Sequence, residues 1–306
     1  MIDQAFLEAL KTELPELDWQ TGAQMSKYTT LRVGGPADCL AEPDSEGALR
    51  ALLKLAGRFG VPVTVIGNGS NLLVRDGGIR GLVIRFGRAF SACEITGETI
   101  AAQSGILLSD LAQHAANAGL AGLEFASGIP GTLGGAVVMN AGAYGGEIVQ
   151  VIKSAEVLSG DDIVTLSRDA LQLSYRHSRM QDTGELVLSA RFRLTPDDPA
   201  AIRARMADLK TRRLEKQPLN LPSAGSFFKR PQGAYAAQLI DEAGLKGFRI
   251  GGAMVSKKHA GFLVNIGGAT AKDFLELMKA VQEKVYERSG FRLEPEVRIL
   301  GEDGRA

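Results

Sequence analysis

The chain has 306 residues, of which 45% are hydrophobic and 23% charged, and its formal net charge is zero. This balance is typical of a globular protein with room for two domains, and it argues against nucleic acid or an anionic membrane as a partner. No window approaches the roughly 20 apolar residues of a membrane span. The acidic, amphipathic N-terminus also lacks the order of a signal peptide, so we expect a cytoplasmic protein without membrane insertion.

The first part of the chain predicts alternating helices and strands. A helix from Gln4 to Leu14 places Phe6 and Leu10 on one face. Between Tyr28 and Pro43 we expect a short strand, a Gly34-Gly35-Pro36 turn and a second strand. Further helices are expected at 45–59 and 108–118, and further strands at 61–67, 81–85 and 99–102.

A small glycine-containing loop, GNGSN at 67–71, directly follows a predicted strand. It is not a dinucleotide fingerprint, because Leu72 stands where a third glycine is needed and the next residues indicate a strand, not a helix. A strand–turn–strand loop of this kind either presents N–H groups to a pyrophosphate or is a plain turn.

The stretch from Gly122 to Gly146 holds eight glycines and almost no charge. Its apolar run, Ala136 to Met139, has the length of a strand. Glycine allows positive φ and close approach to main-chain N–H groups, so the stretch suits a cofactor that lies along the backbone. The alternative is a glycine-rich pair of turns without a ligand, which carries a large cost in conformational entropy.

The second half predicts strands at 152–158, 163–166 and 186–194, and then a charged helix at 199–216 that links to a second domain. That domain is expected to contain a helix at 234–243 and strands at 247–250, 261–266 and 293–300. Its last helix has a capping-box variant, Thr270 with Asp273, and ends at Gly290. Its buried stripe is expected to comprise Phe274, Leu277, Met278, Val281 and Val285.

Metal and triad chemistry are not indicated. The histidines (His114, His177, His259) and the cysteines (Cys39, Cys93) lack the spacing of ligands or of a disulfide framework.

Three polar features could carry chemistry. Arg176 lies in SYRHS between strands, although a solvated arginine there would be ordinary. Ser226 lies in SAGSFFK beside a lysine and two phenylalanines, either as a positioned proton donor or as part of a turn into a buried pair. Glu296 lies in the predicted strand at 293–300, where its carboxylate is either paired with an arginine or available for catalysis.

Six segments occur together in the chain: TTLRVGGPAD, GNGSNLLV, GIPGTLGGAVVMNAGAYG, SYRHS, SAGSFFKRP and LEPEVRILG. In this order they resemble the UDP-N-acetylenolpyruvoylglucosamine reductases over about residues 20 to 300. The short interval between Arg176 and the strand at Leu186 resembles the type II branch, which lacks a tyrosine-bearing insertion.

The resemblance implies an α+β fold with an FAD-binding domain of the vanillyl-alcohol-oxidase (PCMH) class, built of two α/β subdomains, and a smaller α/β substrate-binding domain. We expect the first domain at 1–203, with subdomains at about 1–61 and 62–203, and the second at 204–306. The implied enzyme is an NADPH-dependent flavoprotein oxidoreductase of peptidoglycan precursor synthesis. Through bound FAD it would reduce UDP-N-acetylglucosamine enolpyruvate to UDP-N-acetylmuramate, as a monomer with small-molecule partners.

The family's functional residues carry over to this chain. Arg176 would bind the substrate carboxylate, Glu296 would polarise the enolate, and Ser226 would deliver the proton to the α-carbon after hydride reaches the methylene carbon. The residues expected to contact substrate are Tyr175, Arg176 and Lys229. The residues expected to hold FAD are Arg32, Gly34, Gly35, Gly67, Asn68, Gly69, Ser70, Asn71, Gly128, Gly131, Thr132, Gly134, Gly135, Asn140, Gly142, Ala143 and Tyr144.

Departures from the family pattern occur near the serine. The family's NAGSxFKNP is SAGSFFKRP here, with Ser223 and Arg230 in place of asparagines, and Met180 replaces an aromatic residue. A flavin-dependent carbohydrate oxidase of the same fold is the alternative enzyme, although neither glycine-rich loop offers a histidine to tether FAD. A flavin- or nucleotide-sugar-binding module without turnover is the third reading, and the presence of Arg176, Ser226 and Glu296 argues against it.

Overall fold

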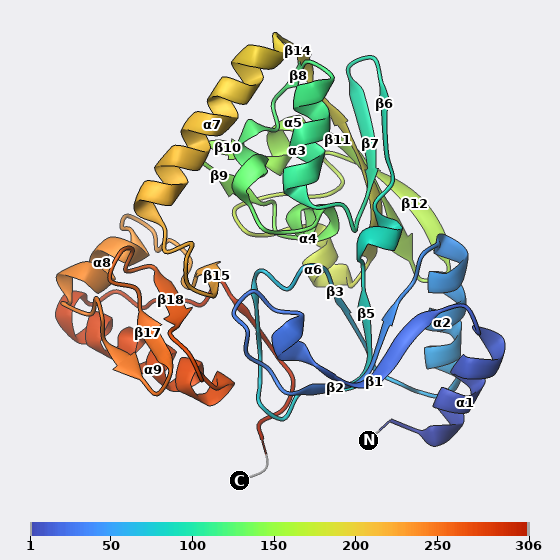
Figure 1. Cartoon of the computed structure of the whole chain (residues 1–306), viewed down its shortest axis with the longest axis horizontal. Helices are drawn as coiled ribbons and strands as arrows, with labels where there is room; N and C mark the ends of the chain where they lie inside the picture. Colours follow the sequence, from blue (N-terminus) through green and yellow to red (C-terminus); the bar gives the residue numbers. More distant parts are fainter. Residues whose placement is uncertain (1, 305–306) are drawn as a thin grey trace.

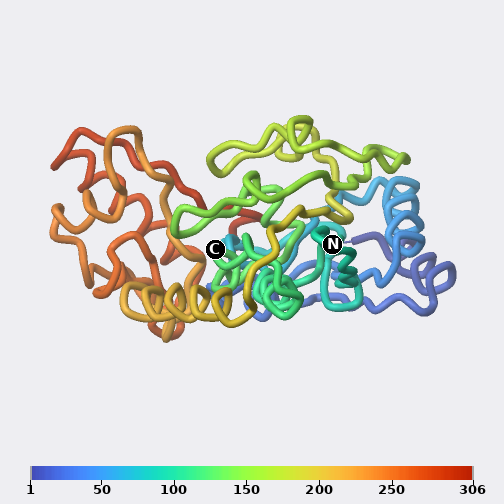
Figure 2. Tube along the Cα trace, turned by 90° about the horizontal axis from the view of Figure 1, so that it is seen from above, coloured from blue at the N-terminus to red at the C-terminus, as the bar shows by residue number. Residues whose placement is uncertain are grey.

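The computed structural model describes residues 2–304 and shows three units, of which the first and second lie one above the other and the third lies at the left end of the molecule (Figures 1 and 2). The first unit is a four-stranded sheet in the order β1-β2-β5-β3, covered by α1 and α2. Strand β1 is antiparallel to β2, whereas β2, β5 and β3 are parallel. Its elements are α1 (Gln4–Glu13), β1 (Asp18–Gln24), η1 (Met25–Lys27), β2 (Pro36–Glu42), α2 (Glu46–Arg58), β3 (Val63–Ile66), β4 (Leu72–Val74) and β5 (Ile79–Arg85).

The second unit is an antiparallel five-stranded sheet in the order β12-β11-β13-β7-β6. Helices α3 and α4 pack on it, and the buried core between them includes Leu111, Leu133 and Phe192. The elements of this unit are η2 (Arg88–Phe90), β6 (Cys93–Thr96), β7 (Thr99–Gln103), α3 (Leu108–Asn117), β8 (Leu120–Ala121), η3 (Glu124–Gly128), α4 (Leu133–Val138), β9 (Gly142–Ala143), β10 (Gly146–Glu147), α5 (Ile148–Val151), β11 (Ile152–Ser159), β12 (Asp162–Ser167), α6 (Arg179–Thr183), β13 (Leu186–Arg193) and β14 (Thr195–Pro196).

Helix α7 (Pro199–Lys216) runs along one side of the molecule from the second unit to the third (Figures 1 and 2). Its start follows capping chemistry: Asp198 accepts a bond from Ala200 N at 3.1 Å, and proline occupies the first turn, where no N–H is needed. The predicted domain boundary at 203/204 falls inside this continuous helix.

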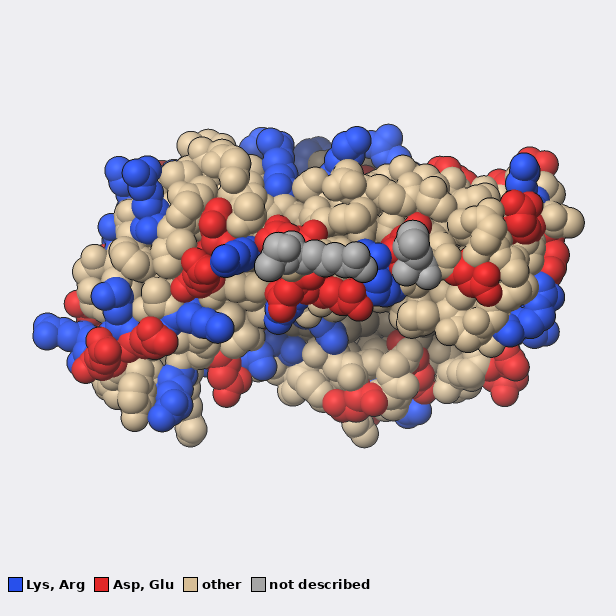
Figure 3. Space-filling view, turned by 90° about the horizontal axis from the view of Figure 1, so that it is seen from below, with Lys and Arg blue, Asp and Glu red and all other residues tan. Residues whose placement is uncertain are grey.

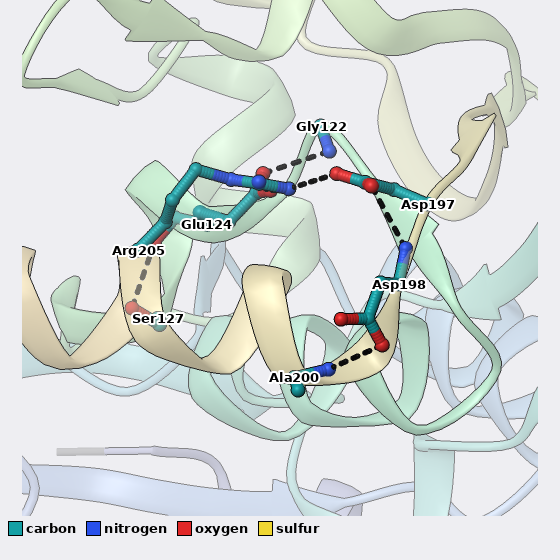
Figure 4. Close-up of polar contacts among 7 residues, drawn as sticks. All are labelled: Gly122, Glu124, Ser127, Asp197, Asp198, Ala200 and Arg205. Carbon is teal, nitrogen blue, oxygen red and sulfur yellow. Dashed lines mark hydrogen bonds and ion pairs between the residues drawn. The ribbon is translucent and has the colours of Figure 1, made fainter.

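An ion cluster anchors the first turns of α7 to the glycine-rich stretch (Figure 4). Arg205 donates from Nε and a terminal nitrogen to Glu124 Oε1, at 3.0 and 2.8 Å, and contacts Asp197 at 2.6 Å. Glu124 also accepts from Gly122 N at 2.7 Å, and its own carbonyl accepts from the Ser127 hydroxyl. The helix and η3 are therefore held in one geometry.

The third unit is an antiparallel sheet in the order β15-β18-β17-β16, packed against α8 and α9. The predicted ends of α9 are confirmed, because the Thr270–Asp273 capping box and the left-handed Gly290 are both present. All five predicted stripe residues are buried. The elements are β15 (Ser223–Ser226), α8 (Ala236–Glu242), β16 (Arg249–Ile250), β17 (Ala253–Val255), β18 (Phe262–Asn265), α9 (Ala271–Ser289) and β19 (Arg298–Leu300).

Strand β19 leaves the third unit and pairs in parallel with β4 of the first, so the chain returns to where it began (Figure 1). Asp76 reinforces this junction by accepting bonds from the N–H groups of Ala271 and Lys272 at the start of α9, at 2.8 and 2.9 Å. Thr30 Oγ1 also donates to the Ser223 carbonyl at 2.7 Å. The first and third units thus share hydrogen bonds as well as a core.

Two predicted strands are wrong. Residues 28–33 form no strand, because Arg32 adopts a left-handed φ of 57°, and the strand of this region lies earlier, at Asp18–Gln24. The strand-length run at 136–139 lies mainly in helix α4, where Leu133, Ala136 and Val137 are buried at helical spacing. Short apolar runs do not distinguish a buried strand from a buried helix.

The last predicted strand is shorter than expected, and several short strands were not predicted. Residues 293–297 lie outside β19, since Pro295 has no N–H for a ladder and makes only an isolated bridge with Phe228. Glu296 is therefore not in a strand. The other strands that were not predicted are β6, β15 and β17 and the two-residue strands β8, β9, β10 and β14.

Acidic and basic side chains are interspersed over the face seen from below, as expected for zero net charge (Figure 3). Among the described residues, no helix combines the length and the hydrophobicity that crossing a membrane requires.

Candidate functional site

The two glycine-rich loops predicted to hold a cofactor lie against each other. Asn68 Nδ2 donates to the Pro130 carbonyl at 2.6 Å, which ties the loop between β3 and β4 to the loop before α4. A Cβ atom on Gly131 would be 3.4 Å from Ser70 Oγ, so the two segments are in van der Waals contact. Segments that are 62 positions apart in sequence therefore form one cradle.

This cradle offers unpaired main-chain donors. Within the described chain, the N–H groups of Asn68, Gly69 and Ser70, and those of Gly131 and Thr132 opposite them, have no backbone acceptor. Successive N–H groups of this kind form concave anion-binding nests. The strand–turn–strand nest predicted for 67–71 is thus present in shape, and the donor set fits a pyrophosphate.

The glycines of the site serve two different purposes. A Cβ atom on Gly69 would collide with the Tyr28 carbonyl, and one on Gly35 would collide with the Asp76 carbonyl, so close approach of the chain to itself requires them. The same explanation applies to Gly34, Gly67, Gly134 and Gly142. A side chain on Gly135 would meet nothing closer than 3.8 Å, so its surroundings leave room for a ligand.

Arg176 occupies the tip of a tight turn and points at Glu296. Ser174 and His177 exchange backbone hydrogen bonds at 3.1 and 3.2 Å, with Tyr175 and Arg176 between them. Arg176 has a left-handed φ of 56°, which is strained for a residue with a side chain. Its Nε lies 2.6 Å from Glu296 Oε1, and its guanidinium lies 5.1 Å from the centre of the Tyr175 ring.

Glu296 is largely buried, with 12% of its side chain exposed. Burial raises its pKa above the usual glutamate value, against the opposing effects of Arg176 and Lys229. Asn71 holds the backbone here, since its Nδ2 donates to the Glu296 carbonyl at 3.1 Å and its own carbonyl accepts from Arg298 N. A buried carboxyl group with a raised pKa suits a hydrogen-bond donor near a developing negative charge.

The serine loop lies alongside the glutamate segment. Glu296 N donates to the Phe227 carbonyl at 2.9 Å, and Lys229 N donates to the Glu294 carbonyl at 2.8 Å. This pairing places Ser226, which is exposed, next to the residue that pairs with Glu296. Arg176, Ser226 and Glu296, distant in sequence, thus converge in the structure.

The two departures in the serine loop, Ser223 and Arg230, have defined contacts. The Ser223 carbonyl accepts the interdomain bond from Thr30, so its side chain is not needed for that link. Arg230 N donates to the Tyr175 hydroxyl at 3.1 Å, and its guanidinium lies 4.5 Å from the centre of the Tyr235 ring. The serine loop and the Tyr175–Arg176 turn are therefore joined directly.

Arg213 lies beside two predicted cofactor residues, Gly128 and Tyr144, and sequence reasoning missed it. It projects from α7 across the backbone of Gly128 and lies 5.8 Å from the ring centre of Tyr144, a predicted cofactor residue with positive φ. Burial lowers the pKa of its guanidinium. Inside a helix with many basic residues, no local signal marks this one.

Not every predicted cofactor residue has a free side chain. Asn140 is 1% exposed and its amide is fully used: Nδ2 donates to Ser174 O and Glu147 Oε2, at 3.0 and 3.1 Å, and Oδ1 accepts from Val149 N. Arg32, by contrast, is exposed in the loop before β2. In the part of the chain that the structure describes, no cluster of histidine, cysteine or acidic residues could hold a metal ion.

Comparison with known proteins places this geometry in a family. A model described as "FAD binding domain" matches residues 37–167, and one described as "UDP-N-acetylenolpyruvoylglucosamine reductase, C-terminal domain" matches residues 217–300. A UDP-N-acetylenolpyruvoylglucosamine reductase of Agathobacter rectalis is 52% identical, over 98% of this chain and all of that relative. The chain belongs to the UDP-N-acetylenolpyruvoylglucosamine reductase (MurB) family. The relative of the same name in Latilactobacillus sakei is 51% identical over 97% of both chains.

A solved structure of this family agrees over nearly the whole chain. The crystal structure of the reductase (MurB) from Thermus caldophilus superposes with a TM-score of 0.81 at 38% identity, covering 94% of this chain and 99% of that one. An alkyldihydroxyacetonephosphate synthase, 17% identical with a TM-score of 0.50, shares the fold over 64% of this chain and 41% of its own. The predicted fold class, FAD as cofactor and the flavoprotein oxidoreductase class are confirmed.

Proposed function

We propose that this chain reduces UDP-N-acetylenolpyruvoylglucosamine to UDP-N-acetylmuramate with NADPH, for peptidoglycan synthesis. The observation that supports it is the convergence of Arg176, Glu296 and Ser226, from three distant segments, on the side of the molecule where the glycine cradle lies. Bound FAD supplies the hydride chemistry between NADPH and the enolpyruvyl methylene carbon.

The cradle would hold FAD by its backbone. The loops at 67–71 and 128–135 would direct N–H groups at the pyrophosphate, and the segment at 142–144 would line the neighbouring wall. Arg32, Gly34 and Gly35 would shape the edge that belongs to the first unit. This assignment follows the unpaired donors and open glycines of the two loops.

Arg176 would bind the enolpyruvyl carboxylate and stabilise the negative charge that develops as the double bond accepts hydride. Its position is preset by Glu296, at 2.6 Å from Nε, and by the Gly142 carbonyl, 3.5 Å from Nη2, which leaves Nη1 to reach a carboxylate. Glu296, with its raised pKa, would donate a hydrogen bond to the same charge in its protonated form.

Ser226 would deliver the proton to the α-carbon. Ser226 is exposed next to the buried Phe227–Phe228 pair, so its hydroxyl is accessible to a ligand. Lys229 and Tyr175 would contact the substrate. Lys229 is 3.6 Å from Glu294, a weak surface pair that a phosphate could displace.

We further propose that the chain works as a monomer in the cytoplasm, with domains at 1–203 and 204–306 that carry the cofactor and the substrate. A membrane-spanning helix is absent from the described residues, and both proposed ligands are small molecules.

The test is a visible spectrum followed through two anaerobic half-reactions. NADPH should bleach the flavin, and the enolpyruvate nucleotide should restore the colour. Ser226→Ala should leave bleaching unchanged and slow recolouring by roughly 10²- to 10⁴-fold, the usual contribution of a positioned proton donor. Recolouring of the parent by oxygen alone would indicate an oxidase, and a Ser226→Ala variant that recolours at the parent rate would overturn the serine's role.

A further inference from the structure

The turn that carries Arg176 is held at both ends by side-chain amides. Gln181, on the short helix α6, donates from Nε2 to the Arg176 carbonyl at 3.0 Å and to the Val138 carbonyl at 2.8 Å. Asn140, at the end of α4, donates from Nδ2 to the Ser174 carbonyl at 3.0 Å. The two amides therefore grip the carbonyls that flank Tyr175 and Arg176.

These contacts explain how the turn keeps a strained shape. A non-glycine residue with left-handed φ costs about 1–3 kcal/mol and persists only where its surroundings overdetermine it. Arg176 (φ 56°) and Asn140 (φ 40°) both have this conformation, so the turn and its support are strained together. A relaxed turn would rotate the Arg176 side chain away from Glu296.

We propose that Gln181, together with Asn140, is a positioning residue that aims Arg176 at the reacting carboxylate. The assignment rests on the proposed function. It also moves Asn140 from the predicted cofactor contacts to the support of the turn, because its amide has no donor left for a ligand. Gln181 donates to the backbone of Arg176 and Val138 and lies 3.9 Å from Met139 Sδ, so the role that we assign to it is exercised through the backbone of the turn.

The first test is Gln181→Met, which keeps the length of the side chain and removes both donated bonds. We expect flavin content, melting temperature and bleaching by NADPH close to the parent, with recolouring by the enolpyruvate nucleotide slowed roughly 10- to 100-fold, since small misplacements of a catalytic group have effects of that size. Gln113→Met is the matched control, because Gln113 bonds only Asn117 on the surface of α3.

A double-mutant cycle shows whether the effect passes through Arg176. In an Arg176→Lys background, Gln181→Met should slow recolouring by less than twofold, because the group it positions is already gone. Full additivity of the two losses would overturn the proposal. Failure of the parent itself to recolour with the nucleotide would instead overturn the proposed function, so the two outcomes are distinct.

Gln181→Glu provides an independent readout if the methionine variant folds poorly. An ionised carboxylate facing two carbonyl oxygens repels both, whereas its protonated form can donate to one of them. The ratio of variant to parent rate should therefore rise as the pH is lowered, and the ratio cancels the titration of neighbouring His177, Asp182 and Glu296, which both proteins share. A ratio that stays flat with pH would contradict the proposal.

Asn140→Asp separates the two roles considered for Asn140. The aspartate keeps an acceptor for Val149 N and loses the donors to the Ser174 carbonyl and to Glu147. Retained flavin with slowed recolouring would support the positioning role, and loss of FAD affinity with an unchanged recolouring rate in the loaded enzyme would overturn it.

Discussion

Arg176 and Glu296 form an ion pair that is largely shielded from solvent. Their side chains are 20% and 12% exposed, so each desolvated group relies on the other. Removal of one member would leave an uncompensated charge, a change that costs more than the pair contributes. A substrate carboxylate entering beside Arg176 would add a second acceptor to the same guanidinium and shift charge away from Glu296.

The raised pKa of Glu296 makes a prediction about pH. The folded form binds this proton more tightly than the unfolded chain, so the group's contribution to stability is lost as the pH rises from the ordinary glutamate value, about 4.3, through the raised folded pKa. The stability of Glu296→Gln minus that of the parent should therefore rise over this window and stay constant above it, on top of a pH-independent cost for leaving Arg176 without its partner. Melting temperatures from pH 4 to 8 measure this difference, and a value for variant minus parent that falls with rising pH would contradict the assignment.

The pH dependence of the rate at which the nucleotide recolours reduced flavin gives a second measure of the protonation of Glu296. The parent rate should fall as the pH rises through the folded pKa of Glu296, because only the protonated form donates. Glu296→Gln keeps an amide donor that does not titrate, so the rate of this variant should not fall as the pH rises through that range. A variant whose rate still falls there would assign the fall to another residue.

Sequence reasoning was most informative where a residue belongs to a local motif. Arg176, Ser226 and Glu296 each lie in a short recognisable segment, but the pairing of the first with the third spans 120 positions and became visible only in the fold. Gln181 had no signal at all. Asn71 is a predicted cofactor residue, and its side chain also holds the Glu296 backbone, a contact that no local pattern encodes.

Helices with clear N-terminal capping residues were predicted well, whereas helices and strands of only a few residues were not. Ser45 and Thr270 accept bonds from the third residue of their helices, as their sequence positions imply, and both helices start where expected. Segments of four to six residues, such as α4, depend on packing around them. The strand predicted around Arg32 failed for a different reason. Arg32 has a left-handed φ in the middle of an apparent strand, and residue propensities do not predict such a conformation.

Helix α9 receives part of its N-terminal capping from another unit. Thr270 satisfies the Asp273 N–H, while the carboxylate of Asp76 satisfies those of Ala271 and Lys272. Asp76→Ala should lower the free energy of unfolding by about 1 kcal/mol or somewhat more, as loss of a helix cap does.

The measurement is denaturant unfolding of the flavin-free protein, with Asp303→Ala as a control. Asp303 is a surface partner of Arg75 and is 76% exposed, so its loss should have little effect. If Asp76→Ala lowers the free energy of unfolding no more than Asp303→Ala does, capping of α9 by Asp76 contributes no more than a surface ion pair.

At the scale of the whole molecule, the first and third units share one core. Leu31, Val33 and Leu73 of the first unit are at most 2% exposed, and they pack with side chains of α8 and α9. Burial of three such side chains contributes roughly 5–9 kcal/mol. That is comparable with the entire stability of a typical domain, about 5–15 kcal/mol.

The fragment 1–216 should therefore fail to retain FAD, although it includes the whole of the predicted cofactor domain. We expect its ratio of absorbance at 450 and 280 nm after gel filtration to fall well below that of the full chain. Co-expression with 217–306 should restore it, because β19 can then pair with β4. Stoichiometric flavin in the isolated fragment would contradict this.

The return of β19 to β4 has a consequence for how the protein is made. Asn71 and the Glu296 carbonyl that it holds are 225 positions apart. A ribosome adding about 5–20 residues per second needs roughly 10–45 s to travel that distance. During this interval the loop at 67–71 exists without strand β19, so we expect FAD to bind to the finished chain and not to the nascent one.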